Sequence, residues 1–94
     1  MRIVGGRFRG RAIASPEHES VRPTSDRVRE SVFNILLHGI DEFSIEGLRV
    51  IDLFAGTGAL GLEAVSRGAA YCLFVEDGAE SRGLIRQNVE AFGL

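Results

Sequence analysis

The sequence predicts an α/β fold in which parallel strands alternate with helices. Two short apolar segments, 48–54 and 70–76, are typical of buried strands, and each precedes a stretch that predicts a helix. The connections between them are short, which favours parallel strands joined by right-handed crossovers. The first strand leads into Gly56-x-Gly58-x-x-Gly61, a spacing that lets a backbone turn tightly and approach a ligand.

The first 22 residues are predicted to form a β-hairpin and a loop. "RIVGGRFRGRAI" indicates two short strands with glycines that permit turns, and the loop "ASPEHESVRP" follows. Residues 1–15 contain four arginines and no acid, so they carry +4 within a chain of net charge −2. A cationic arm on an acidic body suggests an anionic partner such as nucleic acid, and a solvated hairpin explains it equally well.

The first helix is predicted over 25–38, and Gly39 is able to end it. Its start follows Pro23, where three consecutive residues can cap it: Thr24, Ser25 and Asp26. Its inward face is expected to hold Val28, Val32, Ile35 and Leu36.

The strand at 48–54 is a continuous apolar run with one acid, which predicts a strand covered on both faces. A helix then extends to Arg67 and is ended by Gly68. After the strand at 70–76, the last helix is predicted over 78–93. Its inner face is expected to hold Leu84, Ile85, Val89 and Phe92.

Composition narrows the class of protein. With 45% hydrophobic and 26% charged residues, the chain is predicted to be a soluble globular protein without a transmembrane helix. The lone Cys72 is expected to be a buried small hydrophobe, and no metal site is predicted because His18 and His38 form no ligand set. Without a visible signal peptide or a disulfide framework, a cytoplasmic location is expected.

A doubly wound sheet needs more strands than two. A third strand is due where the sequence stops at Leu94, so we expect the N-terminal portion of a longer protein, with a truncated sheet. An exposed sheet edge makes self-association of this piece an expectation as well.

Two acids indicate which ligand the glycine turn would hold. Glu76 ends the second strand and can accept hydrogen bonds from a ribose diol, which several cofactors carry. Asp52 discriminates, because a carboxylate beside the turn repels a pyrophosphate and attracts the cationic sulfonium and ammonium of S-adenosylmethionine. The alternatives are a helix-capping or buried-network role for Asp52 and an ordinary exposed strand end for Glu76.

Longer motifs resemble a known family. "VIDLFAGTGALGLEAVSRGA" with "FVE" resembles motifs I and II of Rossmann-like S-adenosylmethionine-dependent methyltransferases. "RIVGGRFRGRAI" followed by "RPTSDRVRESVFNIL" is similar to the RsmD family of 16S rRNA guanine-N2 methyltransferases. The resemblance spans essentially the whole sequence. It implies an N-terminal hairpin and loop over 1–22 and the first part of a cofactor-binding domain over 23–94.

The resemblance also implies roles for individual residues. The methionine and ribose side of S-adenosylmethionine would be lined by Asp52, Phe54, Gly56, Thr57 and Gly58. Glu76 would hold the ribose hydroxyls, with Asp77 near the adenine. Thr24 and Arg27 would lie near the cofactor carboxylate, against the alternatives of plain capping and a solvated helix face. The segment that would help engage 16S rRNA or the small ribosomal subunit carries Arg7, Arg9 and Arg11.

One family motif does not occur in the sequence. Such enzymes carry an Asn/Asp-Pro-Pro-Tyr/Phe tetrapeptide that binds the target amine and stacks on the flipped base, whereas the only prolines here are Pro16 and Pro23. No catalytic residue is therefore assigned, and we expect the chain to be inactive alone. The open alternatives are a methyltransferase for another substrate, a non-catalytic RNA-binding module and, disfavoured by Asp52, a nicotinamide-dependent oxidoreductase.

Overall fold

The computed structural model describes residues 1–15 and 25–94 of the chain. Its elements are α1 (Asp26–His38), β1 (Arg49–Leu53), α2 (Ala59–Ser66), β2 (Tyr71–Val75) and α3 (Ala79–Ala91). The predicted α/β class and element order are confirmed, and the boundaries agree to within one or two residues. Residues 16–23 of the predicted loop, and the capping candidate Thr24, lie outside the described residues.

The two strands pair in parallel, as predicted. The register runs from Arg49 opposite Tyr71 to Leu53 opposite Val75, and α2 connects the strands. One further bond, from the Ala55 amide to the Val75 carbonyl at 3.0 Å, extends the pairing past the end of β1. Both strands therefore end at the same edge of the sheet, where the loops after β1 and β2 lie side by side.

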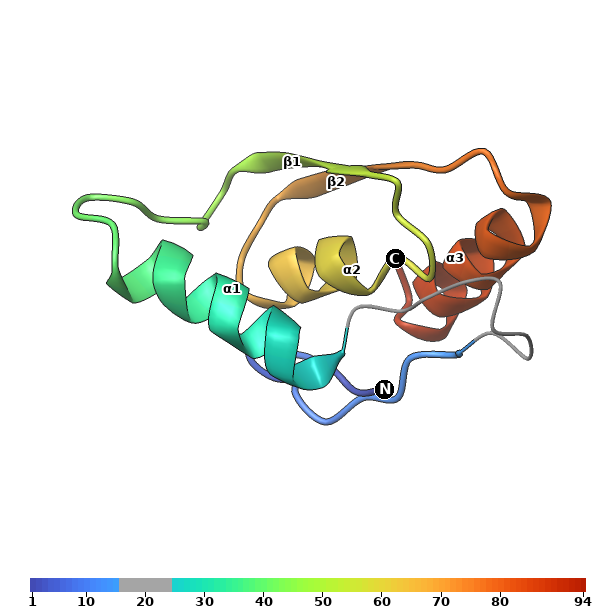
Figure 1. Ribbon diagram of the computed structural model, residues 1–94, viewed down its shortest axis with the longest axis horizontal. Helices are drawn as coiled ribbons and strands as arrows, with labels where there is room; N and C mark the ends of the chain where they lie inside the picture. Colours follow the sequence, from blue (N-terminus) through green and yellow to red (C-terminus); the bar gives the residue numbers. More distant parts are fainter. Residues whose placement is uncertain (16–24) are drawn as a thin grey trace.

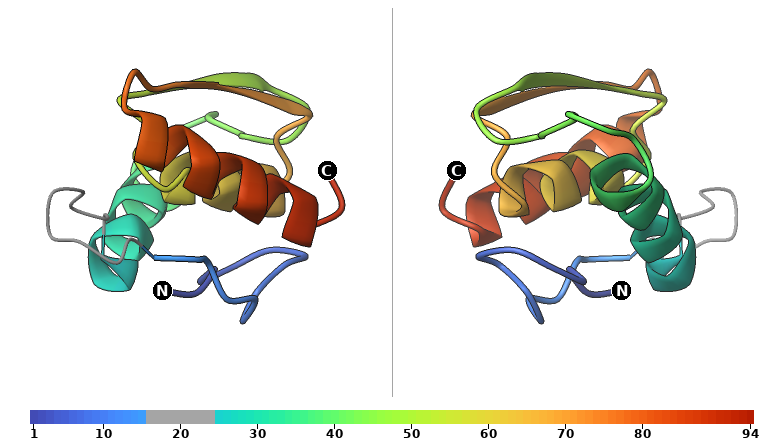
Figure 2. Two further views of the ribbon diagram at one scale, coloured as in Figure 1. Left: turned by 90° about the vertical axis from the view of Figure 1, so that its right-hand side faces the viewer. Right: turned by 90° about the vertical axis from the view of Figure 1, so that its left-hand side faces the viewer.

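The molecule has three layers: the sheet, the helices and the N-terminal segment, residues 1–15 (Figures 1 and 2). All three helices lie on one side of the sheet, so only that face of the strands is covered. The prediction of strands covered on both faces is wrong for the described chain. The alternation of a pleated strand leaves one row of apolar side chains exposed: Ile51, Leu53, Leu73 and Val75.

Helix α2 is buried on nearly all sides because it lies between the sheet and the N-terminal segment. Its Leu62 packs in a cluster with Ile3 and Ile13 of the N-terminal segment. Its opposite side approaches the sheet so closely that a Cβ on Gly61 would lie 2.4 Å from the Phe74 ring. A helix enclosed in this way needs small or apolar residues around its whole circumference, and ALGLEAVS supplies them at most positions.

The predicted N-terminal hairpin is only partly confirmed. The chain doubles back, with the Ile3 amide 2.9 Å from the Arg11 carbonyl and the Ile13 amide 2.8 Å from the Met1 carbonyl. Only one antiparallel bridge forms, between Arg2 and Ala12, in place of two strands. The physical reason is that neighbouring backbone amides bond to side chains of α2 and α3 and not across the hairpin.

Helix α1 begins and ends as predicted, but a different face is buried. The Ser25 hydroxyl caps it by accepting from the Val28 amide at 3.2 Å, and Gly39 ends it. The inward residues are Arg29 and Phe33, with Leu36 partly buried. Three residues of the predicted face are exposed: Val28, Val32 and Ile35. The helix is rotated about its axis relative to the prediction, because the Arg29 side chain points into an ion-pair network beneath α2.

Two other packing predictions need adjustment. On α3, Ile85 and Phe92 are buried as predicted, whereas Leu84 and Val89 are only half-buried. Cys72 is also half-buried and not fully buried. Among the described helices, none is long and apolar enough to cross a membrane.

Candidate functional site

Glu76 joins the two loops at the carboxyl edge of the sheet. One oxygen of its carboxylate accepts from the Gly56 amide and the other from the Gly78 amide, each at 2.9 Å. The hydrogen bonds from Gly78 and Gly56 lower the Glu76 pKa below its usual value, because they favour the ionised form. The structure thus brings together the first glycine of the turn and the acid predicted to bind a ribose.

The residues of the turn differ in what they face. Gly56 has a φ of +59°, and nothing lies within 4 Å of the place where its Cβ would be. Phe54 also adopts a positive φ, +56°, and the residue is 91% exposed beside the turn. A bulky residue in the left-handed region is uncommon and occurs preferentially at functional sites. The turn therefore presents open backbone at Gly56 next to an exposed aromatic ring.

Asp52 occupies the helix side of the same edge. Its Oδ2 atom accepts from the Gly61 amide at 3.0 Å, in the first turn of α2. Burial raises the Asp52 pKa, the Glu76 charge raises it further, and the Gly61 hydrogen bond opposes both. This contact shows the helix-capping role that the sequence left open for Asp52. A role of Asp52 in ligand binding stays a prediction.

An apolar pocket of about 290 Å³ lies next to Asp52, between α1, β1 and α2. Its lining combines aliphatic and aromatic side chains from these elements and from the loop between α1 and β1, with Asp52 as the one acid. Asp52 itself is 8% exposed, and this burial is the main cause of its raised pKa.

The remaining predicted cofactor residues are spread around this edge. Thr57 is buried, and its hydroxyl accepts from the Ala59 amide at 3.3 Å. The side chain of Thr57 is thus used within the fold, and its backbone forms part of the turn. Asp77 is exposed and its carbonyl accepts from the Arg82 guanidinium. Arg27 lies on the exposed side of α1. Thr24 falls outside the described residues, so a joint site for Thr24 and Arg27 stays a prediction.

Cys72 lies close enough to Asp52 to respond to its charge. Burial first, and the Asp52 carboxylate second, raise the Cys72 pKa to about 11. The thiol therefore stays protonated at neutral pH and is a poor nucleophile. Within the described residues no three metal-ligating side chains gather to form a possible metal site.

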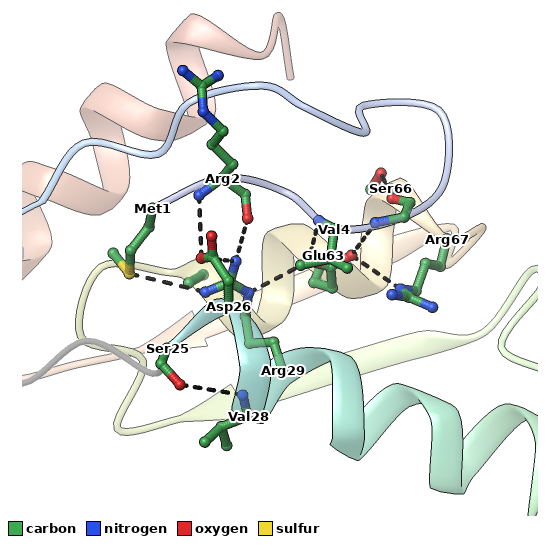
Figure 3. Close-up of polar contacts among 12 residues, drawn as sticks. Met1, Arg2, Val4, Ser25, Asp26, Val28, Arg29, Glu63, Ser66 and Arg67 are labelled. Atoms are coloured by element: carbon green, nitrogen blue, oxygen red, sulfur yellow. Dashed lines mark hydrogen bonds and ion pairs between the residues drawn. The ribbon is translucent and has the colours of Figure 1, made fainter.

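The sequence reasoning missed a buried charged network beneath α2 (Figure 3). The Glu63 carboxylate accepts from the amides of Val4 and Gly5 at 3.0 and 2.9 Å. It also pairs with Arg67 at 3.0 Å and with Arg29 at 3.4 Å. The Glu63–Arg67 spacing of four residues was the available signal, since it predicts a pair on one helix face.

Asn88 was also missed. It is 1% exposed on α3, where its side chain contacts the glycine turn and the N-terminal segment. An amide flanked by Ile85 and Phe92 at helical spacing was the signal in the sequence, because a polar residue on an apolar face needs partners.

The arginines predicted to bind RNA lie on the N-terminal segment, which forms the layer opposite the sheet. All three, Arg7, Arg9 and Arg11, are exposed. Arg7 stacks over the Phe8 ring at 4.6 Å, and Arg11 lies 5.4 Å from the same ring. Arg11 also donates to the Ala91 carbonyl at 3.2 Å, so it is partly held by α3. This surface therefore combines cations with an aromatic ring.

A family model described as Conserved hypothetical protein 95 matches residues 1–94. The chain belongs to this family. The relatives of this chain confirm its resemblance to the RsmD methyltransferases. Ribosomal RNA small subunit methyltransferase D of Escherichia coli K12 is 47% identical over 87 residues, which are 92% of this chain and 41% of the relative. The protein of the same name from Haemophilus influenzae is 37% identical over 90 residues, 96% of this chain and 44% of the relative.

Solved structures agree with these relatives. An Escherichia coli structure described as "Putative methyltransferase yhhF" has a TM-score of 0.81 at 38% identity, over 99% of this chain and 47% of its own. A Pyrococcus horikoshii structure described as a "putative RNA methyltransferase" has a TM-score of 0.61 at 28% identity, over 87% of this chain and 39% of its own. The chain of this family member thus spans under half the length of these proteins.

Proposed function

We propose that the protein is an S-adenosylmethionine-dependent methyltransferase that acts on rRNA, at the N2 atom of a guanine in 16S rRNA. The observation that carries the cofactor assignment is the Glu76 carboxylate, which joins Gly56 and Gly78 at the carboxyl edge of two parallel strands. Ligands of open α/β sheets bind at this edge. The names of the relatives support rRNA as the substrate class.

The residues present fit this cofactor. Each Glu76 oxygen has a second lone pair, so ribose hydroxyls can donate to it without displacing the two amides. The open space at Gly56 admits a ligand against the backbone, with the exposed Phe54 beside it. Asp52 and Glu76 together make this edge negative, which suits a ligand with two cationic groups and opposes a pyrophosphate.

The division of labour follows from these groups. The cofactor supplies an activated methyl group, and the chain binds and orients it, so positioning and electrostatics are the contribution of the described residues. Arg7, Arg9 and Arg11 contact the phosphates of the rRNA, in the small ribosomal subunit or before its assembly. A cytoplasmic location belongs to the same proposal, and self-association of this chain stays an expectation.

Cofactor binding tests the proposal directly. The full-length protein is expected to bind S-adenosylmethionine in isothermal titration calorimetry, and Glu76→Ala is expected to weaken binding at least about tenfold, or about 1.4 kcal/mol. Asp52→Asn keeps an oxygen for the Gly61 amide and removes only the charge, so it should weaken binding by a similar factor if the charge attracts the ligand. Arg49→Ala, in β1 away from the loops, is the control.

The competing classes of protein predict other outcomes. Tight NAD binding without S-adenosylmethionine binding would indicate an oxidoreductase. RNA binding without any cofactor binding would indicate a non-catalytic module. Cofactor binding with transfer to a protein or small molecule, and none to 16S rRNA, would retain the reaction and overturn the substrate.

A further inference from the structure

The Asn88 carboxamide lies between the glycine turn and the N-terminal segment. Its Nδ2 atom donates to the Thr57 carbonyl at 3.0 Å, and its Oδ1 atom accepts from the Ala14 amide at 2.7 Å. A longer bond of 3.4 Å runs from Nδ2 to the Ala14 carbonyl. One side chain of α3 thus connects backbone positions that lie 31 and 74 residues away in the sequence.

Only an amide in this orientation satisfies its surroundings. The Thr57 carbonyl needs a donor and the Ala14 amide needs an acceptor, so a rotated carboxamide would place an oxygen against the Thr57 oxygen. Asn88 is almost fully buried, so water does not replace a lost partner cheaply. The position of Ala14 and the position of the Thr57 peptide are therefore held by the same group.

Each end of this connection belongs to a different part of the proposed site. The Thr57 peptide leads into Gly58 and forms the turn beside Gly56, where the cofactor is placed. Ala14 is the second-last residue of the N-terminal segment, whose other anchors include Glu63 and Ser66 of α2. All four arginines of this segment are exposed, and three of them are proposed to contact RNA: Arg7, Arg9 and Arg11.

We infer that Asn88 is a positioning residue that couples RNA binding at the N-terminal segment to cofactor binding at the glycine turn. The inference rests on the proposed function. RNA that immobilises the N-terminal segment fixes Ala14, which fixes the carboxamide and with it the Thr57 peptide. Because coupling of binding free energies is reciprocal, the cofactor must favour the RNA-binding arrangement of the segment by the same factor.

The test measures affinity for S-adenosylmethionine in the full-length protein with and without a saturating RNA stem–loop that carries unpaired guanosines. In the wild-type protein, RNA is expected to strengthen cofactor binding at least about fivefold. Asn88→Ala and the isosteric Asn88→Asp, which lacks the Nδ2 donor, should bring this ratio to about one. Gln87→Ala, the exposed neighbouring amide on α3, is the matched control and should keep the wild-type ratio.

If Asn88 has only a structural role, its substitution would lower the melting temperature and leave the ratio of cofactor affinities with and without RNA unchanged. That result would overturn the inference. A wild-type ratio of one, with the cofactor bound, would overturn it too and leave the proposed function standing. Absence of cofactor binding by the wild-type protein would instead overturn the proposed function.

A second measurement needs no variant and covers the case in which both Asn88 variants fail to fold. Addition of S-adenosylmethionine alone should slow hydrogen exchange of the Ala14 amide, whose acceptor is the Asn88 oxygen. The Arg9 amide, which bonds within the N-terminal segment to the Gly6 carbonyl, is the internal reference. Unchanged protection of Ala14 in the cofactor-bound protein would contradict the coupling.

Discussion

The three glycines of the turn have different roles, decided at each residue by what surrounds the missing Cβ. Open space at Gly56 leaves room for a ligand. Gly58, the N-cap of α2, has a φ of +85° and lies against Phe74 and Ile85, so it serves the turn itself. Gly61 serves the contact between helix and sheet, because Phe74 and Cys72 occupy the space beside it. The glycine spacing therefore combines one open position with two that are packed within the fold.

Two glycine-to-alanine substitutions in helices are expected to change stability in opposite directions. A Cβ at Gly61 would lie 2.4 Å from the Phe74 ring and 2.6 Å from the Cys72 sulfur, so Gly61→Ala should destabilise by roughly 1–3 kcal/mol. Gly83→Ala, in α3 with nothing within 4 Å, should stabilise by roughly 0.5–1 kcal/mol. Urea unfolding of the two variants measures both, and a stabilising Gly61→Ala would refute the close packing.

At the scale of elements, the N-terminal segment is held mainly by side chains of helices. Glu63 binds the Val4 and Gly5 amides, and the Ser66 hydroxyl donates to the Gly5 carbonyl at 2.6 Å and accepts from the Phe8 amide at 3.0 Å. These polar anchors lie beside the apolar contact of Ile3 and Ile13 with Leu62. The segment is therefore a docked layer of the fold.

Removal of the Glu63 charge is expected to release this layer. Both Arg29 and Glu63 have fully buried side chains, so Glu63→Gln leaves a buried guanidinium with less compensation and should cost about 3–5 kcal/mol. Glu30→Gln, on the exposed side of α1, is the control and should change stability by less than about 0.5 kcal/mol. Faster hydrogen exchange at Val4 and Gly5, together with a lower urea midpoint, is the expected result; unchanged exchange at these amides would contradict it.

Element types and boundaries could be predicted because they depend on local signals such as the Ser25 cap and the apolar runs of the strands. The buried face of α1 could not, since Arg29 has the character of a solvent-facing residue until Glu63, 34 residues later, is brought beside it. The incomplete hairpin has the same origin. The backbone amides of the hairpin bond to side chains far along the sequence, and the residue pattern within the hairpin cannot predict these partners.

At the scale of the whole molecule, the arginines proposed to bind RNA and the acids of the candidate cofactor site lie in different layers. Arg7, Arg9 and Arg11 lie on the N-terminal segment, which is on the far side of the helices from the sheet (Figures 1 and 2). The two acids of the candidate cofactor site, Asp52 and Glu76, lie in β1 and just after β2. The order of Glu76 after a strand could be predicted from the sequence, but its bonds to Gly56 and Gly78 depend on strand register.

The salt dependence of RNA binding is expected to report on the arginines of the N-terminal segment. Removal of one arginine–phosphate interaction should reduce the slope of log K against log salt by about 0.7–0.9. Arg9→Ala should lower the slope without loss of stability, whereas Arg11→Ala should affect both, since Arg11 also bonds to Ala91. Arg49→Ala, in the sheet layer, is the control. Equal slopes for Arg9→Ala and the wild-type protein in filter binding would indicate a merely solvated segment.

The docking of the N-terminal segment has a consequence for biosynthesis. Its anchors, Glu63, Ser66 and Asn88, follow it in the sequence by 58 to 74 residues. A ribosome makes the segment before α2 and α3, and both helices must leave the exit tunnel before the segment meets its partners. Until then its backbone amides and isoleucines stay exposed to solvent and to chaperones. The segment thus finds its native neighbours only after the helices that follow it have been made.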